Sequence, residues 1–200
     1  YTQTHEPVDP HPDFYGKTGN GSFADVLAQT DVYVGELLDT IEELGLKEDT
    51  IFIFTSDNGR EGVPRSFGFT GPWRSGMFSP YEGSLRVPFL ISWPGKIPQK
   101  QISNEIVHQI DIFPTIAKFI DAEMPKDRTI DGVDQSDFFM GKTKKSSRES
   151  LICSTLGPRS RRSVLNPFSV NSLAAHPPDI PAPIIIVSKV FDFIKFLKFD

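Results

Sequence analysis

The feature that most constrains the fold is an apolar run ending in polar, turn-forming residues, "TIFIFTSDNGREG" at residues 50–62. Residues 51–54 have no polar member, so we expect a strand buried on both sides. Asp57, Asn58 and Gly59 come almost directly after it. Ser-Asp-Asn-Gly is also good turn chemistry, because Asn and Gly tolerate positive φ. From these residues alone, a plain turn and a ligand site both remain open.

A helix is expected before this strand. Ser22, with Asp25 three residues later, forms a variant of the capping box, and Gly45 stands where a left-handed residue ends a helix. Apolar residues recur between them at helical spacing: Phe23, Val26, Leu27, Val34, Leu37, Leu38, Ile41 and Leu44. The order helix, short turn, buried strand predicts an α/β fold with a mostly parallel sheet.

The residues after the strand predict a long loop and then further regular elements. Residues 56–86 are too many for a simple connector, and loops of that length usually carry function. A second apolar run covers residues 87–93. Asp111 is expected to open another helix, with Pro114 in its first turn, where no backbone donor is needed.

Composition excludes several classes of function. The formal charge of -5 gives no electrostatic case for nucleic acid. A single cysteine, Cys153, excludes an intramolecular disulfide and a multi-cysteine zinc site. No signal peptide is visible at the start. The apolar run at residues 184–187 is too short to span a bilayer, and lysines and an aspartate interrupt the chain after it.

The chain changes character near Arg148, so we divide it into a domain over residues 1–150 and a divergent tail over 151–200. The tail is Pro-rich with little periodicity. Its last segment, "IIIVSKVFDFIKFLKFD", fits either a strand or an amphipathic helix.

Asp57 and Asn58 are candidate metal ligands. Binding sites of open α/β sheets lie at the carboxyl ends of strands, where the predicted helix–strand order places these two residues. A carboxylate and an amide carbonyl are hard oxygen ligands, suited to Ca²⁺ or Mg²⁺. Two ligands do not complete a site, so others must come from elsewhere.

Several ordered motifs resemble one family. "HEP" at 5–7, the segment from "FYGKTGNG" to "TSDNG", and "YEGSLRVPFLISWPGKIP" succeed one another as in sulfatases. Over residues 1–150 the chain resembles the C-terminal half of an arylsulfatase catalytic domain, in the alkaline phosphatase superfamily. The resemblance implies a three-layer α/β fold with a mostly parallel central sheet.

The resemblance also implies hydrolysis of a small-molecule or glycan sulfate ester. Family members use a formylglycine nucleophile and a divalent cation, usually Ca²⁺. Asp57 and Asn58 match half of the metal's protein ligands, and His5 matches a histidine that contacts the sulfate and protonates the leaving oxygen. The formylglycine motif and an Asp-Asp pair are expected upstream, so these 200 residues alone should be inactive. A periplasmic, secreted or lysosome-like location is implied by the family only.

The sequence departs from the family at two points. Met77 stands where many sulfatases carry a sulfate-binding Lys, and Met cannot pair with an anion. Arg74 could supply the cation, and a solvated loop arginine is an equal alternative. Cys153 lacks the Pro and Arg of the formylglycine motif, so we do not assign it as the nucleophile.

Two other functions stay open at this point. One is a phosphodiesterase of the same superfamily, and the other is a non-catalytic fragment that binds a partner. The remaining polar candidates have structural interpretations: His11 as a solvated side chain, His108 as a residue that caps or packs near the start of a helix, Asp131 as turn chemistry, and Glu82 with Arg86 as residues that position the loop, for instance through an ion pair.

Overall fold

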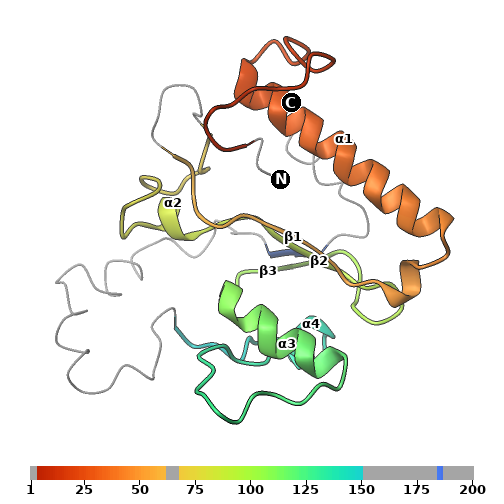
Figure 1. Cartoon of the computed structure of the whole chain (residues 1–200). Coiled ribbons are helices and arrows are strands. Elements are labelled where there is room, and N and C mark those ends of the chain that lie inside the picture. The colour runs from red at the N-terminus through yellow and green to blue at the C-terminus, as the bar shows by residue number, and fades with distance from the viewer. Residues whose placement is uncertain (1–3, 62–67, 151–183, 187–200) are drawn as a thin grey trace. The chain divides into compact units, whose positions relative to one another are not determined.

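The computed structural model describes residues 4–61, 68–150 and 184–186, in two compact units. The first unit is Tyr1–Pro94 with Ile185–Asp200, and the second is Gly95–Ile184. In chain order the first unit holds α1 (Ser22–Glu43), the 3₁₀ turn η1 (Lys47–Asp49), β1 (Phe52–Thr55), α2 (Glu82–Leu85) and β2 (Phe89–Ser92) (Figure 1). The second holds β3 (Gln101–Ser103), η2 (Gln109–Asp111), α3 (Ile112–Phe119) and α4 (Ser136–Phe139), and β4 (Ile184–Ile186) falls at the boundary.

The predicted domain boundary after residue 150 stays a prediction, because residues 151–183 and 187–200 lie outside the described ranges. In the segment whose structure was undecided, the described residues 184–186 form the strand β4. No helix of the described ranges is long and apolar enough to cross a membrane.

α1 begins at Ser22, as predicted, but by a different mechanism. Its N-cap is Gly21, with φ of 89° and no side-chain cap, so the capping-box prediction was wrong. Asp25 instead reaches back over the preceding loop and accepts hydrogen bonds from the Thr18 hydroxyl (2.7 Å), the Thr18 N–H (2.9 Å) and the Gly16 N–H (2.8 Å). These bonds, the one from the Thr18 hydroxyl first, lower the pKa of the Asp25 carboxyl.

The end of α1 confirms the prediction for Gly45. This residue has φ of 69°, and its N–H donates to the Glu42 carbonyl at 3.0 Å. The Leu46 N–H donates to the Ile41 carbonyl at 3.0 Å. This pair of bonds is the Schellman motif, which requires a residue that tolerates positive φ.

Only part of the apolar face of α1 is covered by the described residues. Val26 and Val34 are fully buried, whereas three leucines of the predicted apolar set are exposed: Leu27, Leu37 and Leu44. On the same helix the Oδ1 atom of Asp31 is buried without a hydrogen-bond partner in the described ranges. Part of the apolar face of α1 is therefore exposed among the described residues.

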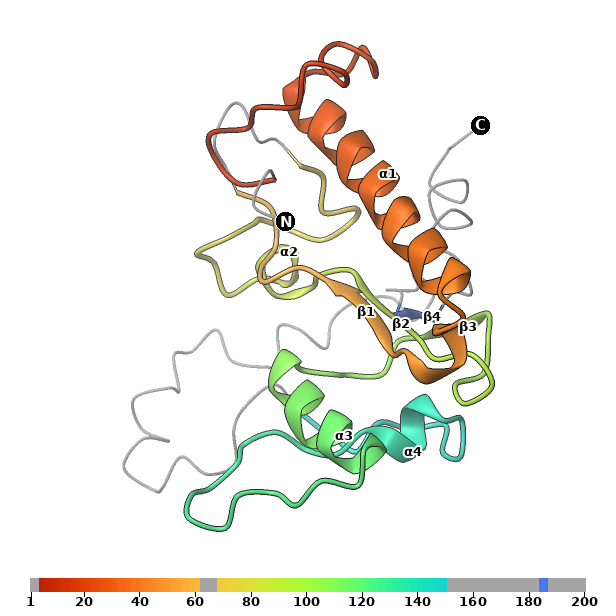
Figure 2. The same cartoon turned by 45° about the vertical axis from the view of Figure 1, so that its right-hand side comes forward.

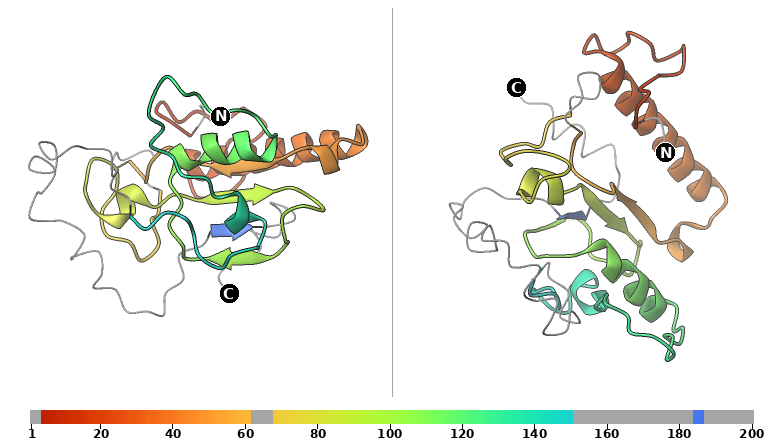
Figure 3. Two further views of the ribbon diagram at one scale, coloured as in Figure 1. Left: turned by 90° about the horizontal axis from the view of Figure 1, so that it is seen from below. Right: turned by 60° about the vertical axis from the view of Figure 1, so that its left-hand side comes forward.

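β1 and β2 form an antiparallel pair, with Phe52 opposite Ser92 and Thr55 opposite Phe89. This pair differs from the mostly parallel sheet that we predicted. The reason is that α2 lies at the carboxyl end of β1, so the chain returns to that end and β2 runs back along β1 (Figures 1 and 3). A parallel pair would need a crossover to the other end.

The two strands differ in burial. Phe89, Leu90 and Ile91 of β2 are buried, whereas all four residues of β1 are half-buried. The prediction that β1 is buried on both sides was therefore wrong, because β2 is its only strand neighbour among the described residues. The helices and strands together confirm the α/β class.

A buried ion pair organises the second unit, in which α3 and α4 lie side by side (Figure 2). Asp111, fully buried before α3, accepts hydrogen bonds from the backbone N–H groups of His108 and Val133, both at 2.9 Å. Arg148 adds a fork, with Nη2 2.6 Å from Oδ1 and Nε 2.8 Å from Oδ2. α3 begins directly after Asp111, its N-cap residue, as predicted, and the 3₁₀ turn η2 precedes it. The His108 side chain accepts a hydrogen bond from the Ile110 N–H and caps that turn.

The charge state of Asp111 predicts acid sensitivity. Burial raises the pKa of this carboxyl, but hydrogen bonds from Arg148, Val133 and His108, with the Arg148 charge, outweigh burial and lower the pKa overall. The stabilisation is therefore complete above the unfolded-state pKa of about 4 and is lost as the pH falls through the lower folded-state value.

Urea unfolding between pH 7 and pH 2 tests this expectation. The urea midpoint of unfolding should fall in acid. Asp111→Asn should have a lower midpoint than the wild type at neutral pH, but its midpoint should fall less on acidification. An equal acid-induced loss in both proteins would contradict the role given to Asp111.

Candidate functional site

The polar residues after β1 form a tight turn at the carboxyl end of that strand. Asp57 Oδ1 accepts a hydrogen bond from the Asn58 backbone N–H at 2.9 Å, and the Asn58 side-chain nitrogen donates to the Gly59 carbonyl at 2.8 Å. That bond uses only the nitrogen, so the side-chain oxygen of Asn58 keeps its capacity as a ligand. Asp57 is exposed and Asn58 is half-buried. Turn chemistry and a ligand role are thus compatible in the same residues.

The donor set of this turn fits part of a metal site. Ca²⁺ takes about six to eight oxygen ligands, and a carboxylate beside an amide oxygen is suited to it. Residues 4–61 and 68–150, however, contain no group of three or more His, Cys, Asp or Glu side chains that could hold a metal ion. Asp57 and Asn58 therefore fit a cation only together with further ligands.

His5 approaches the same loop from the start of the chain. Its Nε2 lies 4.0 Å from Glu61 Oε1, four residues after Asp57, and its Nδ1 lies 2.8 Å from the Glu6 carbonyl oxygen. A hydrogen bond to a carbonyl requires the proton on Nδ1, which leaves Nε2 directed to the loop to accept or release a proton. The side chain of His5 is 73% exposed, so a substrate can reach it.

Three backbone hydrogen bonds join the loop after β1, α2 and the segment before α2 to one another. The Gly59 N–H donates to Ser84 O (2.9 Å), the Met77 N–H to Arg60 O (2.8 Å), and the Gly83 N–H to Arg74 O (3.0 Å). We call the three segments that they join, residues 58–60, 74–77 and 81–84, the loop frame.

Glycines make these close contacts possible. A Cβ atom on Gly59 would lie 1.9 Å from the Gly83 carbonyl oxygen, one on Gly83 2.2 Å from Ser75 O, and one on Gly76 2.5 Å from Arg60 O. No side chain fits at those distances, so the loop frame depends on glycine at all three positions. The turn of Asp57 and Asn58 is thereby fixed to two segments that come later in the chain.

Two arginines of the loop stack on aromatic rings. The Arg74 guanidinium lies 4.3 Å from the centroid of the Tyr81 ring, and that of Arg86 lies 4.4 Å from the Trp73 ring. Arg86 also pairs with Glu82, which confirms the predicted ion pair. Arg74 is exposed at the surface of the loop. Its predicted contact with sulfate stays a prediction.

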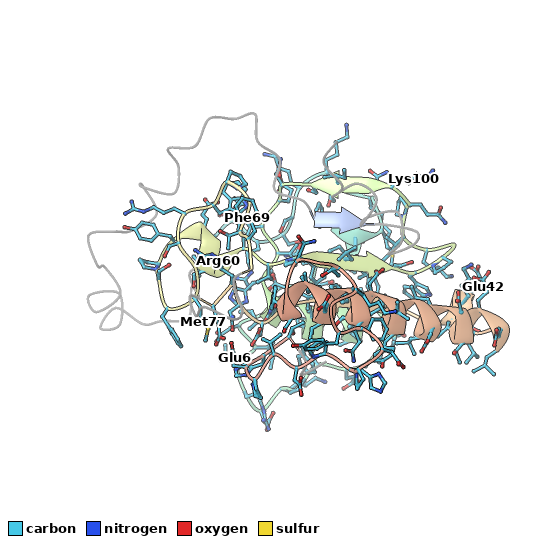
Figure 4. All side chains as sticks on the ribbon, turned by 90° about the horizontal axis from the view of Figure 1, so that it is seen from above. Glu6, Glu42, Arg60, Phe69, Met77 and Lys100 are labelled. Atoms are coloured by element: carbon cyan, nitrogen blue, oxygen red, sulfur yellow. The ribbon has the colours of Figure 1, made fainter. Side chains whose placement is uncertain are left out.

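Sequence reasoning missed the loop frame and the position of Arg60. Figure 4 shows Arg60 in the loops beyond the end of β1, together with Phe69 and Met77. The sequence signal was the recurrence of glycine at residues 59, 76 and 83, but spacing alone does not tell which glycines meet. His11 is exposed and pairs with Asp13, as expected for a solvated side chain. Cys153 and His176 lie outside the described residues.

Comparisons with known proteins identify relatives over most of the chain. The model of the family described as sulfatase matches residues 1–122, and the model described as N-sulphoglucosamine sulphohydrolase, C-terminal, matches residues 76–171. N-acetylgalactosamine-6-O-sulfatase of Bacteroides thetaiotaomicron is 38% identical over 159 residues, which cover 74% of this chain and 30% of the relative. Human arylsulfatase A is 40% identical over 150 residues, with 74% and 29% covered. The chain thus spans about a third of the length of these relatives.

Solved structures give the same result for the fold. The PsFucS1 sulfatase from Pseudoalteromonas sp. superposes with a TM-score of 0.67 at 32% identity, covering 72% of this chain and 29% of that one. A Bacteroides thetaiotaomicron structure described under metabolism of multiple glycosaminoglycans gives 0.62 at 34% identity, covering 73% and 32%. The predicted alkaline-phosphatase-like fold is confirmed by these neighbours.

Proposed function

Because this chain belongs to the sulfatase family, we propose that it forms the metal-binding part of a sulfuric ester hydrolase. The observation that carries the proposal is the turn after β1, where Asp57 and Asn58 stand beside the loop that His5 approaches. Two hard oxygen ligands and a proton carrier at one strand end are what the hydrolysis of an anionic ester requires. The substrate class is a small-molecule or glycan sulfate ester.

Asp57 and Asn58 would hold a divalent cation, Ca²⁺ or Mg²⁺, with ligands from outside these 200 residues. When bound, such a cation stabilises the negative charge that develops on the sulfate oxygens. The chain contains no Cys/Ser-x-Pro/Ala-x-Arg segment from which a formylglycine could be made. The nucleophile of the proposed enzyme therefore belongs to the rest of the protein.

His5 is proposed to bind the sulfate group and to protonate the leaving oxygen through Nε2. Glu61, with Oε1 4.0 Å from that atom, orients the ring. The predicted periplasmic, secreted or lysosome-like location rests on the family resemblance alone and stays a prediction.

The test is hydrolysis by the protein expressed from its complete coding sequence. An aryl sulfate and an aryl phosphodiester are compared, with Ca²⁺ added and after removal of metal by a chelator. Preferential hydrolysis of the sulfate ester, lost on chelation and restored by Ca²⁺, supports the proposal. Preference for the phosphodiester would identify the protein as a phosphodiesterase of the same superfamily. Hydrolysis of neither ester would favour a non-catalytic binding protein.

His5→Ala should lower kcat by about a hundredfold or more, the usual contribution of a general acid. The melting temperature should hardly change, because His5 is largely exposed and, within the described part of the chain, its polar contacts are with Glu6 and Glu61. The loss in kcat should shrink for esters of more acidic phenols, whose oxygen needs no proton to leave. His11→Ala is the matched control and should change neither quantity. A variant that melts early but turns over normally would make His5 structural.

A further inference from the structure

A sulfate ester is an anion, so a site that holds it needs cationic donors besides a metal. This inference rests on the proposed function. Besides His5, the described part of the loops around the turn after β1 offers three candidates, Arg60, Arg74 and Arg86. Met77, although half-buried in the loop frame, has no charge to offer.

Arg86 is already engaged on two sides. Its Nε pairs with a Glu82 oxygen, and its guanidinium lies 4.4 Å from the centroid of the Trp73 ring. A carboxylate partner neutralises the guanidinium, so an anion gains little from approaching it. Arg86 therefore stabilises the loop and is not a candidate for binding a ligand.

Arg74 is exposed, and its guanidinium lies over Tyr81 at 4.3 Å. Stacking on a ring leaves the charge in place but fixes where it points. Within the loop frame the Arg74 carbonyl accepts the Gly83 N–H, whereas the Gly59 N–H donates to Ser84 O. No backbone bond of the loop frame therefore joins Arg74 directly to the turn of Asp57 and Asn58.

Arg60 stands directly after the ligand turn, two residues from Asn58. Its main chain is fixed, because its carbonyl accepts the Met77 N–H at 2.8 Å. Its side-chain stem passes between two glycines: a Cβ on Gly68 would lie 3.3 Å from Arg60 Cβ, and one on Gly76 would lie 3.1 Å from Arg60 Cγ. The chain thus leaves space for this side chain on both sides.

No acidic side chain of the described ranges pairs with Arg60, which is half-buried. Its sequence neighbour Glu61 approaches His5 instead. Figure 4 shows Arg60 near Met77, the residue that cannot bind an anion. A guanidinium with no carboxylate partner in the described ranges, carried two residues after Asn58 on a fixed main chain, has the charge and the forked donors that a sulfate group requires.

We propose that Arg60 binds the sulfate group of the substrate, supplying the positive charge that Met77 lacks. Two N–H donors of the guanidinium hold two sulfate oxygens, and a cation held by Asp57 and Asn58 would supply further positive charge to the same group. Arg60 is therefore a determinant of affinity for sulfate. It takes no part in proton transfer.

The test compares Arg60→Gln, Arg60→Lys and Arg74→Gln in the complete protein, with Arg128→Gln as the control. Arg128 is an exposed arginine whose partner is its neighbour Asp127. Arg60→Gln should raise KM for an aryl sulfate and Ki for inorganic sulfate by about tenfold to a hundredfold, as expected for hydrogen bonds to a charged group. Arg60→Lys should recover part of the loss, and unchanged melting temperatures would show that each variant is folded.

Direct titration with sodium sulfate, measured by calorimetry, separates this inference from the proposed function. If the wild type hydrolyses no sulfate ester, the proposed function fails, whereas weaker sulfate binding by Arg60→Gln still supports the role of Arg60. Equal sulfate binding by Arg60→Gln and the wild type would overturn the inference. A loss confined to Arg74→Gln would overturn it as well and assign the anion to Arg74.

Discussion

Replacing Asp57 by Ala should remove the bound cation and sulfate ester hydrolysis together. Asp57 is the charged member of the proposed ligand pair in the turn after β1, and the adjacent Asn58 offers a neutral oxygen, which would bind a hard cation less strongly. Charge stabilisation by a catalytic cation is worth several kcal/mol, so kcat should fall by on the order of a thousandfold. Calorimetric titration with Ca²⁺ and a steady-state assay on the same preparation measure both effects.

Two further variants give this experiment its contrast. Asn58→Ala should weaken Ca²⁺ binding less than Asp57→Ala does. Asp57→Asn keeps the shape and the hydrogen bond to the Asn58 N–H but removes the charge, so it should also lose the cation. Unchanged Ca²⁺ affinity in Asp57→Ala would mean that the strand-end turn is not the metal site.

Arg148→Ala should lower the free energy of unfolding by about 3–5 kcal/mol, the cost of leaving one partner of a buried ion pair alone. Arg148 is 8% exposed and Asp111 is fully buried, so water cannot replace the lost guanidinium. The Arg148 Nη2 also donates to the Asp131 carbonyl at 3.0 Å, so the turn at Asp131 should loosen too. Urea unfolding of the wild type and the variant gives the difference.

The double variant Asp111→Asn with Arg148→Met should be less unstable than Arg148→Ala, because it leaves no buried charge. Arg128→Ala breaks an exposed pair of similar geometry and should leave the midpoint nearly unchanged. A midpoint shift in Arg148→Ala as small as that in Arg128→Ala would show that the Asp111 pair contributes little.

Local sequence rules predicted those parts of the fold that depend on local chemistry. The extent of α1 and its end at Gly45 result from helical spacing and from one residue that tolerates positive φ. The start of α1 shows the limit of such rules: Asp25 satisfies the pattern of a cap, yet its carboxylate bonds to Gly16 and Thr18. The Asp25 carboxylate could cap the helix or bond to the preceding loop, and the sequence pattern does not reveal which of the two it does.

The direction of β2 and the partners of the site depend on contacts between distant segments. The turn of Asp57 and Asn58 was predictable because apolar residues directly before it specify a strand. The bond from Gly59 to Ser84 was not, because it depends on how residues 60–83 return. The Asp111–Arg148 pair spans 37 positions and was missed for the same reason.

A binding loop has to hold its own position and also contact a ligand. In the loop frame these two tasks fall to different residues. Its position is set by main-chain bonds and by Gly59, Gly76 and Gly83, none of which presents a side chain to a ligand. The residues between those glycines are thus free to differ in charge and size without displacing the turn of Asp57 and Asn58. If that turn holds the metal as proposed, a relative could exchange the residues that contact the anion while the turn stays in place. In evolutionary terms, single substitutions between the glycines can change substrate preference in this architecture, whereas the three glycines themselves cannot be replaced.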